Sequence, residues 1–469
     1  MAREPVSLNR TTAPFTEASP PDDLQIEDLA NGEVLIGDPE SDIPEQMESQ
    51  FDENLAEILD PIDLKRKGQT LISYYDRDRE ARSEWEERYK DGLKTLDPDG
   101  GLDESEDERA TRGLSTVVHP MIAEAASQFN ARAIAELYPS GGPVKTTIVG
   151  DPNEELEEQA RRVREFMNYQ ITQEMPEYFP DLDQMLFHLP LVGQTFKKVW
   201  WDANMDRQCS QFVKAEDFVV APESKDLHTS PRYTHVIQMS RNDYNKYVQS
   251  GFYMATDYAS SDIDPSGDTI GQIEGVDELD DSEDDTVTLL EMHVYEIFDD
   301  INDVEYDEDE VKVAIPYVVT IDYNNNNIVS IRRNWHENDE RMERRDWFVS
   351  YKFLPGLGFY GFVDLDATVD DVNKAIMPLP FKEPSGSLFN LLGFIVQAGQ
   401  RFASTADLNV GDVNPNAPVG STVALIEQGS KAFSAIHKRL HYSQGQEFKL
   451  LAELNAENLP ESFTFSLSG

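Results

Sequence analysis

The chain has 469 residues, of which 90 are Asp or Glu and 40 are Lys or Arg, so its formal net charge is -50. A charge of this size repels nucleic acid at long range and argues against a protein that wraps or scans DNA, although it equally suits any acidic chain that stays in solution. The single cysteine, Cys209, excludes a disulfide or a thiolate metal cluster within one chain. No apolar run approaches the ~18 residues of a membrane span and the first residues lack the apolar core of a signal peptide, so we expect a soluble protein made in a reducing cytosol.

Residues 1–60 contain 16 acidic residues and the two arginines Arg3 and Arg10, with few aromatic residues. Such a composition buries too little apolar surface to order itself, so it predicts a largely disordered acidic arm. We expect ordered structure to begin near Pro61.

Residues 61–250 have the pattern of an α+β region. Amphipathic periodicity predicts helices over Asp63–Lys94, His119–Tyr138 and Asp151–Thr172. Shorter apolar segments bounded by turn residues predict strands over Lys145–Gly150, Gly193–Asp202, Cys209–Pro222 and Arg232–Ser240.

Residues 251–286 predict an exposed acidic loop, and residues 287–362 predict an antiparallel β region. Strand patterns cover Thr286–Phe298, Val311–Tyr323, Asn327–Asn338 and Arg345–Pro355. An asparagine-rich turn at Asn324–Asn327 joins the second of these strands to the third. Because strands and helices are segregated along the chain, the fold class is α+β.

Residues 379–455 predict two long helices joined by a loop rich in proline and asparagine, followed by an extended tail over 456–469. In the second helix, Ile426, Phe433 and Leu440 recur every seven residues as an apolar stripe. The cationic residues of this region are Arg401, Lys431, Lys438 and Arg439. A helix of this kind can pack on a neighbour and show charge to solvent, and it can equally be a core helix with a solvated face.

One motif imitates a dinucleotide site: Gly356, Gly358 and Gly361 form G-x-G-x-x-G after a predicted strand. A dinucleotide site needs a helix that begins within the glycines. Here Phe359 and Tyr360 fill the turn and the next predicted helix begins near Thr368, so a glycine-rich bend is favoured over a nucleotide-binding α/β enzyme.

Two patterns weakly suggest metals. Residues 262–274 partly imitate a calcium loop, with the closing acid, Glu274, one position late. His437 and His441 lie four residues apart, but no third ligand is near and Lys438 and Arg439 between them oppose a cation. The chain has no G-x-x-x-x-G-K-[ST] and no G-x-S-x-G, so we expect no enzyme, no cofactor and no metal site.

Three stretches closely resemble the portal proteins of short-tailed double-stranded DNA bacteriophages. They are "HPMIAEAASQFNARAIAELYPSGGPVK" from His119, "FLPGLGFYGF" from Phe353, and the pair "MPLPFKEPSGSLFNLLGFIVQAGQRFAS" and "APVGSTVALIEQGSKAFSAIHKRLHYSQGQEFKLL" from Met377 and Ala417. The resemblance runs from about residue 61 to 455. The glycine motif belongs to it, which supports the structural interpretation of those glycines.

The resemblance implies a structural subunit with a wing-like α+β region and long helices of a stem or tunnel. About twelve copies would form a ring, the head-to-tail connector at one vertex of the virion, assembled in the host cytoplasm. Such a ring binds the terminase large subunit, capsid and scaffold proteins, and tail or adaptor proteins, and guides DNA non-specifically without touching a membrane. Arg401, Lys431, Lys438 and Arg439 are then the candidate DNA-facing residues of the channel.

The chain departs from the family between Phe362 and the "LPLP" element. Portals of this kind carry there a glycine-rich apolar stretch and a long helical segment, whereas residues 363–378 form a shortened junction. The chain also stops where a portal subunit would continue. An acidic assembly scaffold without a channel is the remaining alternative from another class.

Overall fold

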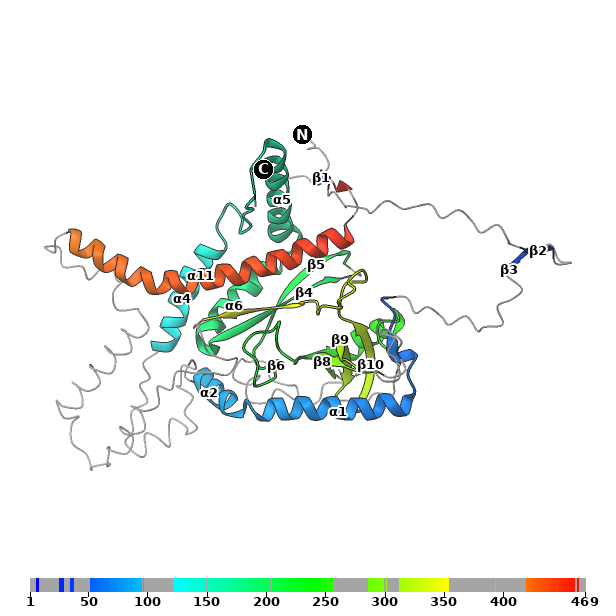
Figure 1. Cartoon of the computed structure of the whole chain (residues 1–469). Coiled ribbons are helices and arrows are strands. Elements are labelled where there is room, and N and C mark those ends of the chain that lie inside the picture. The colour runs from blue at the N-terminus through cyan, green and yellow to red at the C-terminus, as the bar shows by residue number, and fades with distance from the viewer. Residues whose placement is uncertain are drawn as a thin grey trace, which may run out of the picture.

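Two β-sheets, with helices packed on them, form the body of the molecule in the computed structural model (Figure 1). The structure describes residues 51–94, 96, 121–148, 150–202, 205–255, 286–298, 301, 312–353, 393 and 419–459, with the strand segments 6–7, 25–28, 34–37 and 462–463. In the C-terminal helix α11 (Val419–Asn458), side chains are described from Ser434 onward. Helices and antiparallel sheets together make the chain an α+β protein, as the sequence predicts.

The other helical elements alternate with strands only in the middle of the chain. They are the 3₁₀ turn η1 (Leu55–Glu57), α1 (Pro61–Glu80), α2 (Ser83–Lys94), α4 (Met121–Leu137), α5 (Glu154–Tyr169), the π-helical turn η2 (Gln170–Glu174), α6 (Tyr178–Val192) and α7 (Arg241–Gln249).

All strand pairs of the described residues are antiparallel. The larger sheet has the order β10-β9-β8-β7-β6 and the smaller one β11-β4-β5. The strands of these sheets are β4 (Gln194–Asp202), β5 (Arg207–Val213), β6 (Phe218–Val220), β7 (Arg232–Ser240), β8 (Thr286–Glu296), β9 (Ile315–Asp322), β10 (Asn327–Arg333) and β11 (Phe348–Lys352). The strand predictions of the middle region are thereby confirmed apart from Lys145–Gly150 and Cys209–Pro222. The latter is two strands, β5 in the smaller sheet and β6 in the larger one, separated by a turn at residues 214–217.

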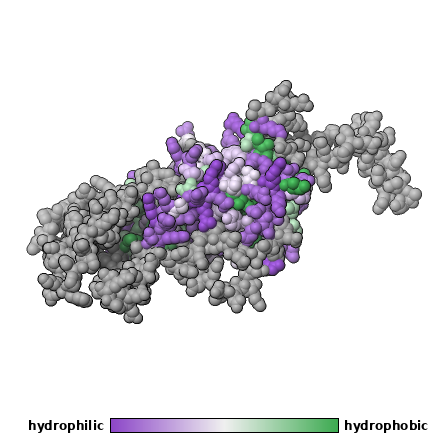
Figure 2. Space-filling model, turned by 90° about the horizontal axis from the view of Figure 1, so that it is seen from below, coloured by the Kyte–Doolittle hydropathy of each residue, from purple (hydrophilic) through white to green (hydrophobic). Residues whose placement is uncertain are grey.

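Helix α1 covers one face of the larger sheet. It begins at Pro61 because the Asp60 carboxylate accepts the Ile62 N–H at 2.7 Å and proline suits the first helical position. Its buried Leu71 and Tyr75 join the core with the sheet residues. Figure 2 looks onto the side on which α1 lies, and the described residues seen there are mostly hydrophilic.

The predicted single helix over Asp63–Lys94 is wrong, because α1 ends at Glu80 and α2 begins at Ser83. The cause is Arg82, which is 2 % exposed. Its guanidinium donates to the carbonyls of Ala215 and Phe218, both at 3.0 Å, and to that of Glu216. The chain bends here so that this side chain enters the body.

The turn between β9 and β10 explains a glycine in α1. Asn326 has φ +56°, a left-handed conformation that asparagine tolerates. A Cβ at position 68 would lie 2.6 Å from the Asn326 carbonyl oxygen, so Gly68 is required for α1 to cross this turn. The predicted asparagine-rich turn is confirmed.

The body begins about ten residues earlier than the predicted boundary at Pro61. Asn54 donates to the Val329 carbonyl at 3.1 Å and accepts the Ile331 N–H at 3.0 Å, so it caps the outer edge of β10. Leu55 and Ala56 are each 1 % exposed. Residues 51–60 therefore belong to the core of the larger sheet and not to the acidic arm.

The arm also contains regular structure that composition did not predict. Strands β2 (Gln25–Asp28) and β3 (Val34–Gly37) pair with each other, and β1 (Val6–Ser7) pairs with β12 (Ser462–Phe463). The hairpin has a sequence signal, since Asn31-Gly32, a dipeptide favoured in hairpin turns, stands between the two strand segments.

The smaller sheet is covered by α6 and α11, on which α4 packs, on the side of the molecule opposite α1 (Figure 1). Helix α6 ends at Gly193, whose φ of +82° permits the turn into β4. Buried side chains of α4, α6, β4, β11 and α11 form one continuous core: Phe129, Leu182, Val199, Tyr351, Leu440 and Leu451.

The predicted strand over Lys145–Gly150 is wrong for residues 145–148, which are extended but pair with no described strand. Instead, the Thr146 hydroxyl donates to the Ala160 carbonyl of α5 at 3.0 Å. Residues 256–285 of the acidic loop, the Gly356 motif and the junction 363–378 lie outside the described residues. So does the first predicted C-terminal helix apart from Gly393.

Candidate functional site: the docked half of α11

The four predicted DNA-facing residues are not equivalent in the structure. Lys438 is exposed on α11, and Lys431 lies on the same helix, where its backbone alone is described. Arg439 is turned toward the body and donates to the Phe353 carbonyl at 2.6 Å. Partial burial lowers the pKa of Arg439. Arg401 lies outside the described residues.

A fully buried ion pair fixes α11 on the smaller sheet. Lys197 Nζ of β4 lies 3.2 Å from Glu447 Oε1 of α11, and both side chains are 0 % exposed. The same carboxylate accepts the Ser210 hydroxyl at 2.6 Å and the Tyr351 hydroxyl. Such a pair costs desolvation that its own attraction barely offsets, but it allows one register of the two elements. We therefore expect it to specify how α11 sits on the sheet.

Two tyrosines complete this buried cluster. Lys197 Nζ lies 3.8 Å from the ring centre of Tyr178. Burial, together with the negative Glu447, raises the pKa values of Tyr178 and Tyr351 well above their ordinary value. Both phenols therefore stay neutral at physiological pH, so Tyr351 remains a donor to the Glu447 carboxylate.

Further polar contacts continue along the docked face. Ser443 Oγ donates to the Ser350 carbonyl at 2.9 Å, and Gln444 Nε2 donates to the Leu137 carbonyl at 3.1 Å. Near the end of α11, Asn455 and Gln170 exchange two amide hydrogen bonds of 2.7 and 3.1 Å. Gln170 is the first residue of η2, so this π-helical turn is tied directly to α11.

The opposite face of α11 is open to solvent. Lys438 and Lys449 are exposed there, and neither makes an ion pair with a described residue. Tyr442, which is 71 % exposed, lies on the same helix. His441 Nε2 lies 3.6 Å from Glu136 Oε1, and the His437 ring packs against Phe129. The two histidines are therefore used separately in packing against α4.

A second charged cluster joins the two sheets. Lys198 Nζ of β4 lies 2.6 Å from Glu291 Oε2 of β8, and His293 Nε2 lies 3.2 Å from Glu291 Oε1. Burial opposes ionisation of Glu291, but the Lys198 ammonium and His293 outweigh it and lower its pKa. Burial, and then the Lys198 ammonium, lower the pKa of neighbouring His235 to about 3. The cluster therefore holds fixed, paired charges where the two sheets meet.

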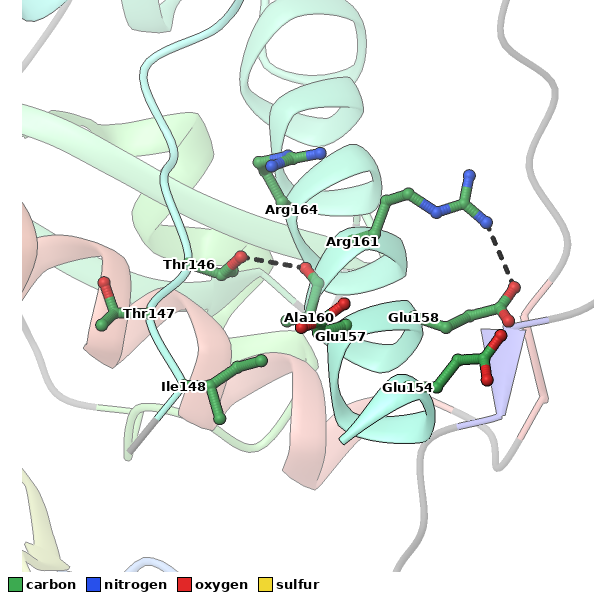
Figure 3. A pocket seen from close by; sticks show the side chains of 9 residues that line it. All are labelled: Thr146, Thr147, Ile148, Glu154, Glu157, Glu158, Ala160, Arg161 and Arg164. Atoms are coloured by element: carbon green, nitrogen blue, oxygen red, sulfur yellow. Dashed lines mark hydrogen bonds and ion pairs between the residues drawn. The ribbon is translucent and has the colours of Figure 1, made fainter. Parts of the chain in front are cut away.

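Two grooves open on the described surface. One, of about 670 Å³, lies between residues 146–148 and α5, where Glu157 and Arg164 line it (Figure 3). In the same view Arg161 points to Glu158, at 3.1 Å. The other, of about 530 Å³, lies between β11, the docked half of α11 and the loop that contains His336 and Arg345. Both are wide and carry mixed charge, which suits a protein segment better than a small ligand.

Within the described residues, no group of three His, Cys, Asp or Glu side chains could hold a metal ion. None of the helices in that part of the chain is long and apolar enough to cross a membrane. The calcium-like residues 262–274 lie outside it.

The most important residues of this site were not predicted. Lys197 and Glu447 are 250 positions apart, so no local pattern connects them. One signal existed: Glu447 stands seven residues after Leu440 and four before Leu451, on the apolar stripe where an unpaired charge would be costly. A charge on an apolar stripe predicts a buried partner, although not its identity.

Comparison with protein-family models and with curated proteins found no match to this chain.

Proposed function

We propose that the chain is the structural subunit of a bacteriophage portal, a ring of about twelve copies at one capsid vertex through which DNA is packaged and ejected. One observation carries the proposal: α11 is a helix of 40 residues of which the C-terminal half is locked to the body. The first half extends beyond the other labelled elements (Figure 1). At 1.5 Å per residue the whole helix is about 60 Å long, which suits a wall of a tunnel.

The apolar stripe of α11 supports contact between neighbouring copies. Leu440, the third member of the stripe, is fully buried against the body. The same seven-residue spacing continues in the sequence to Phe433 and Ile426, in the half that leads away from the body. Such a stripe suits side-by-side packing of helices in a ring.

Charge supports passive guidance of DNA. An acidic wall keeps DNA from adhering, while a few lysines make weak contacts with phosphates that salt screens. Lys438 and Lys431 on α11, with Arg401, are the proposed contacts. Arg439 is assigned a positioning role instead, because its guanidinium holds the Phe353 carbonyl.

In this proposal the chain is not an enzyme and needs no cofactor. The ring binds the terminase large subunit, capsid and scaffold proteins and later the tail or its adaptor. It occupies the portal vertex of the virion after assembly in the host cytoplasm.

Light scattering followed by negative-stain imaging of the purified protein tests the proposal. A ring of about twelve copies with a central hole is the expected result. A monomer, or an assembly without a hole, would overturn the portal and favour an acidic scaffold. Calorimetric titration with NAD and ATP is the companion measurement, since specific binding of either would favour an enzyme that uses Gly356, Gly358 and Gly361.

A further inference from the structure

Three sheet edges of the described chain are closed by side chains. Asn54 caps β10 through Val329 and Ile331. Arg82 donates to the Phe218 carbonyl of β6, and the Asp181 carboxylate accepts the Phe212 N–H of β5 at 2.8 Å. Closing edges in this way prevents unwanted strand pairing.

The outer edge of β11 differs from these three. The Trp347 carbonyl accepts the Val199 N–H at 2.8 Å, so position 347 faces β4 and the alternation turns Phe348 and Ser350 away from it. The Ser350 carbonyl accepts Ser443 Oγ. The main-chain groups of Phe348 and the N–H of Ser350 have no partner among the described residues. Phe348 is 4 % exposed, and unpaired polar backbone in such a buried residue is uncommon in a finished structure.

This edge lies in the groove of about 530 Å³ beside α11. Leu227, Val349 and Leu450 give the groove apolar lining, and exposed Tyr442 also lines it. Residues 145–148 beside α5 also offer unpaired extended backbone (Figure 3). Lys145 and Thr147 there are exposed, however, so water satisfies them and no partner is required.

The arm contains a strand pair that needs a partner. Among the described strands, β2 and β3 pair with each other and with no third strand. An isolated two-stranded hairpin is marginally stable in water, and a third strand stabilises it. Val34, Leu35 and Ile36 make β3 apolar, and Leu227, Val349 and Leu450 offer it apolar contacts in a groove whose other lining residues are mostly charged or polar. Residues 38–50, which join the hairpin to the body, span roughly 40 Å when extended.

We propose that β3 of one copy adds as a fourth strand to β11 of a neighbouring copy, in the groove beside α11. This rests on the proposed ring: each copy would give its hairpin to one neighbour and receive that of the other, which is a head-to-tail contact. Main-chain hydrogen bonds to Phe348 and Ser350 would supply affinity, and the apolar side chains of Leu227, Val349 and Leu450 would favour β3 over the acidic β2.

Ser350→Pro tests the receiving edge. Proline removes the outward N–H of Ser350 and leaves the ladder between β11 and β4 intact, because position 350 does not donate to β4. Ser350→Ala is the matched control, since it keeps the N–H. We expect the Ser350→Pro ring to dissociate at a protein concentration at least tenfold higher than the Ser350→Ala ring, with equal far-UV circular dichroism and thermal midpoint.

Cross-linking tests the occupant without relying on folding of a proline variant. Cysteines are introduced at Val34, Leu35 and Ile36 in one set of proteins and at Ser350 in another, and the two sets are mixed and oxidised. Native Cys209 is a poor competitor, because burial raises the pKa of its thiol to about 11. A disulfide between a β3 cysteine and Cys at position 350 of the other protein is the expected product.

The outcomes separate this inference from the portal. If the Ser350→Pro ring is as stable as the Ser350→Ala ring and no disulfide forms between copies, the strand exchange is wrong and the portal proposal is unaffected. A link that forms within one doubly substituted chain, and not in mixtures, places the hairpin on its own body and also overturns it. A protein without ring symmetry that still links in mixtures keeps the strand exchange and removes the portal.

Discussion

The core under α1 and the core under α11 are built from different kinds of residue. Under α1 the larger sheet contributes Leu290, Val319 and Ile321, all 0 % exposed and apolar. Under α11 the smaller sheet contributes Lys197, equally buried, opposite Glu447. An apolar interface gains stability from area and tolerates small shifts, whereas a buried charge pair is satisfied in one register. The difference indicates that α1 is held mainly for stability and α11 for exact position.

Breaking the buried pair should have the largest effect. Glu447→Ala leaves Lys197 charged and without its carboxylate, so the free energy of unfolding should fall by about 3–5 kcal/mol in denaturant titrations. The double change Lys197→Met with Glu447→Leu is the control and should cost less than Glu447→Ala, because no buried charge remains, although the buried Ser210 and Tyr351 hydroxyls lose their acceptor. Equal losses in the single and double variants would show that volume, and not charge, matters here.

Truncating an apolar side chain in the core under α1 tests the same comparison on the larger sheet. Leu290→Ala should lower the free energy of unfolding by about 2–5 kcal/mol through the cavity it leaves. Hydrogen exchange should nevertheless keep α11 as protected as in the unchanged protein, since the two cores are separate clusters. Selective loss of protection in α11 would contradict that separation.

The joint between the sheets should make stability depend on pH. His235 has its pKa lowered to about 3 from an ordinary value of 6.5, so the unfolded chain binds this proton first as the pH falls. Its contribution is complete above about pH 6.5 and decreases below it, by at most about 1.4 kcal/mol per pH unit. Chemical denaturation at about pH 7 and pH 5 measures the slope, and His235→Gln should flatten it. An unchanged slope would assign the dependence to other groups.

The smallest effect is expected at the exposed lysine of α11. Lys438→Ala removes a charge that makes no ion pair with a described residue, so the free energy of unfolding should change by no more than about 0.5 kcal/mol. Lys197→Ala, measured in the same experiment, is the reference for losing a buried lysine. A larger loss for Lys438→Ala than expected would mean that the Lys438 side chain also packs against the protein.

Local patterns predicted much of the fold. The strands predicted over Arg232–Ser240 and Thr286–Phe298 were identified as apolar segments bounded by turn residues, and α4 from its helical period. Features that depend on distant contacts were not. The break at Arg82 depends on carbonyls near Phe218, more than 130 positions away, and nothing in the helical period reveals it.

The candidate site was predicted as a helix and as residue types, but not as an arrangement. Lys438 was correctly placed on an exposed face by its position beside the apolar stripe. Arg439, the next residue, turns 100° around the helix and reaches the Phe353 carbonyl instead. Lys438 is therefore solvated, whereas the adjacent Arg439 has a structural contact. Its partner, the Phe353 carbonyl, lies 86 positions away in the sequence, so no local pattern could distinguish the two residues.

The position of Asn54 on β10 has a consequence for how the protein is made. The ribosome delivers Asn54 first and Val329 275 residues later. At a synthesis rate of about 5–20 residues per second, roughly 15–55 s pass between the synthesis of Asn54 and that of the strand β10 that it caps. Throughout that interval Leu55 and Ala56, which end fully covered, are exposed on the nascent chain. The earliest segment of the body is therefore among the last to find its place, and during synthesis it is a natural point for a chaperone to bind.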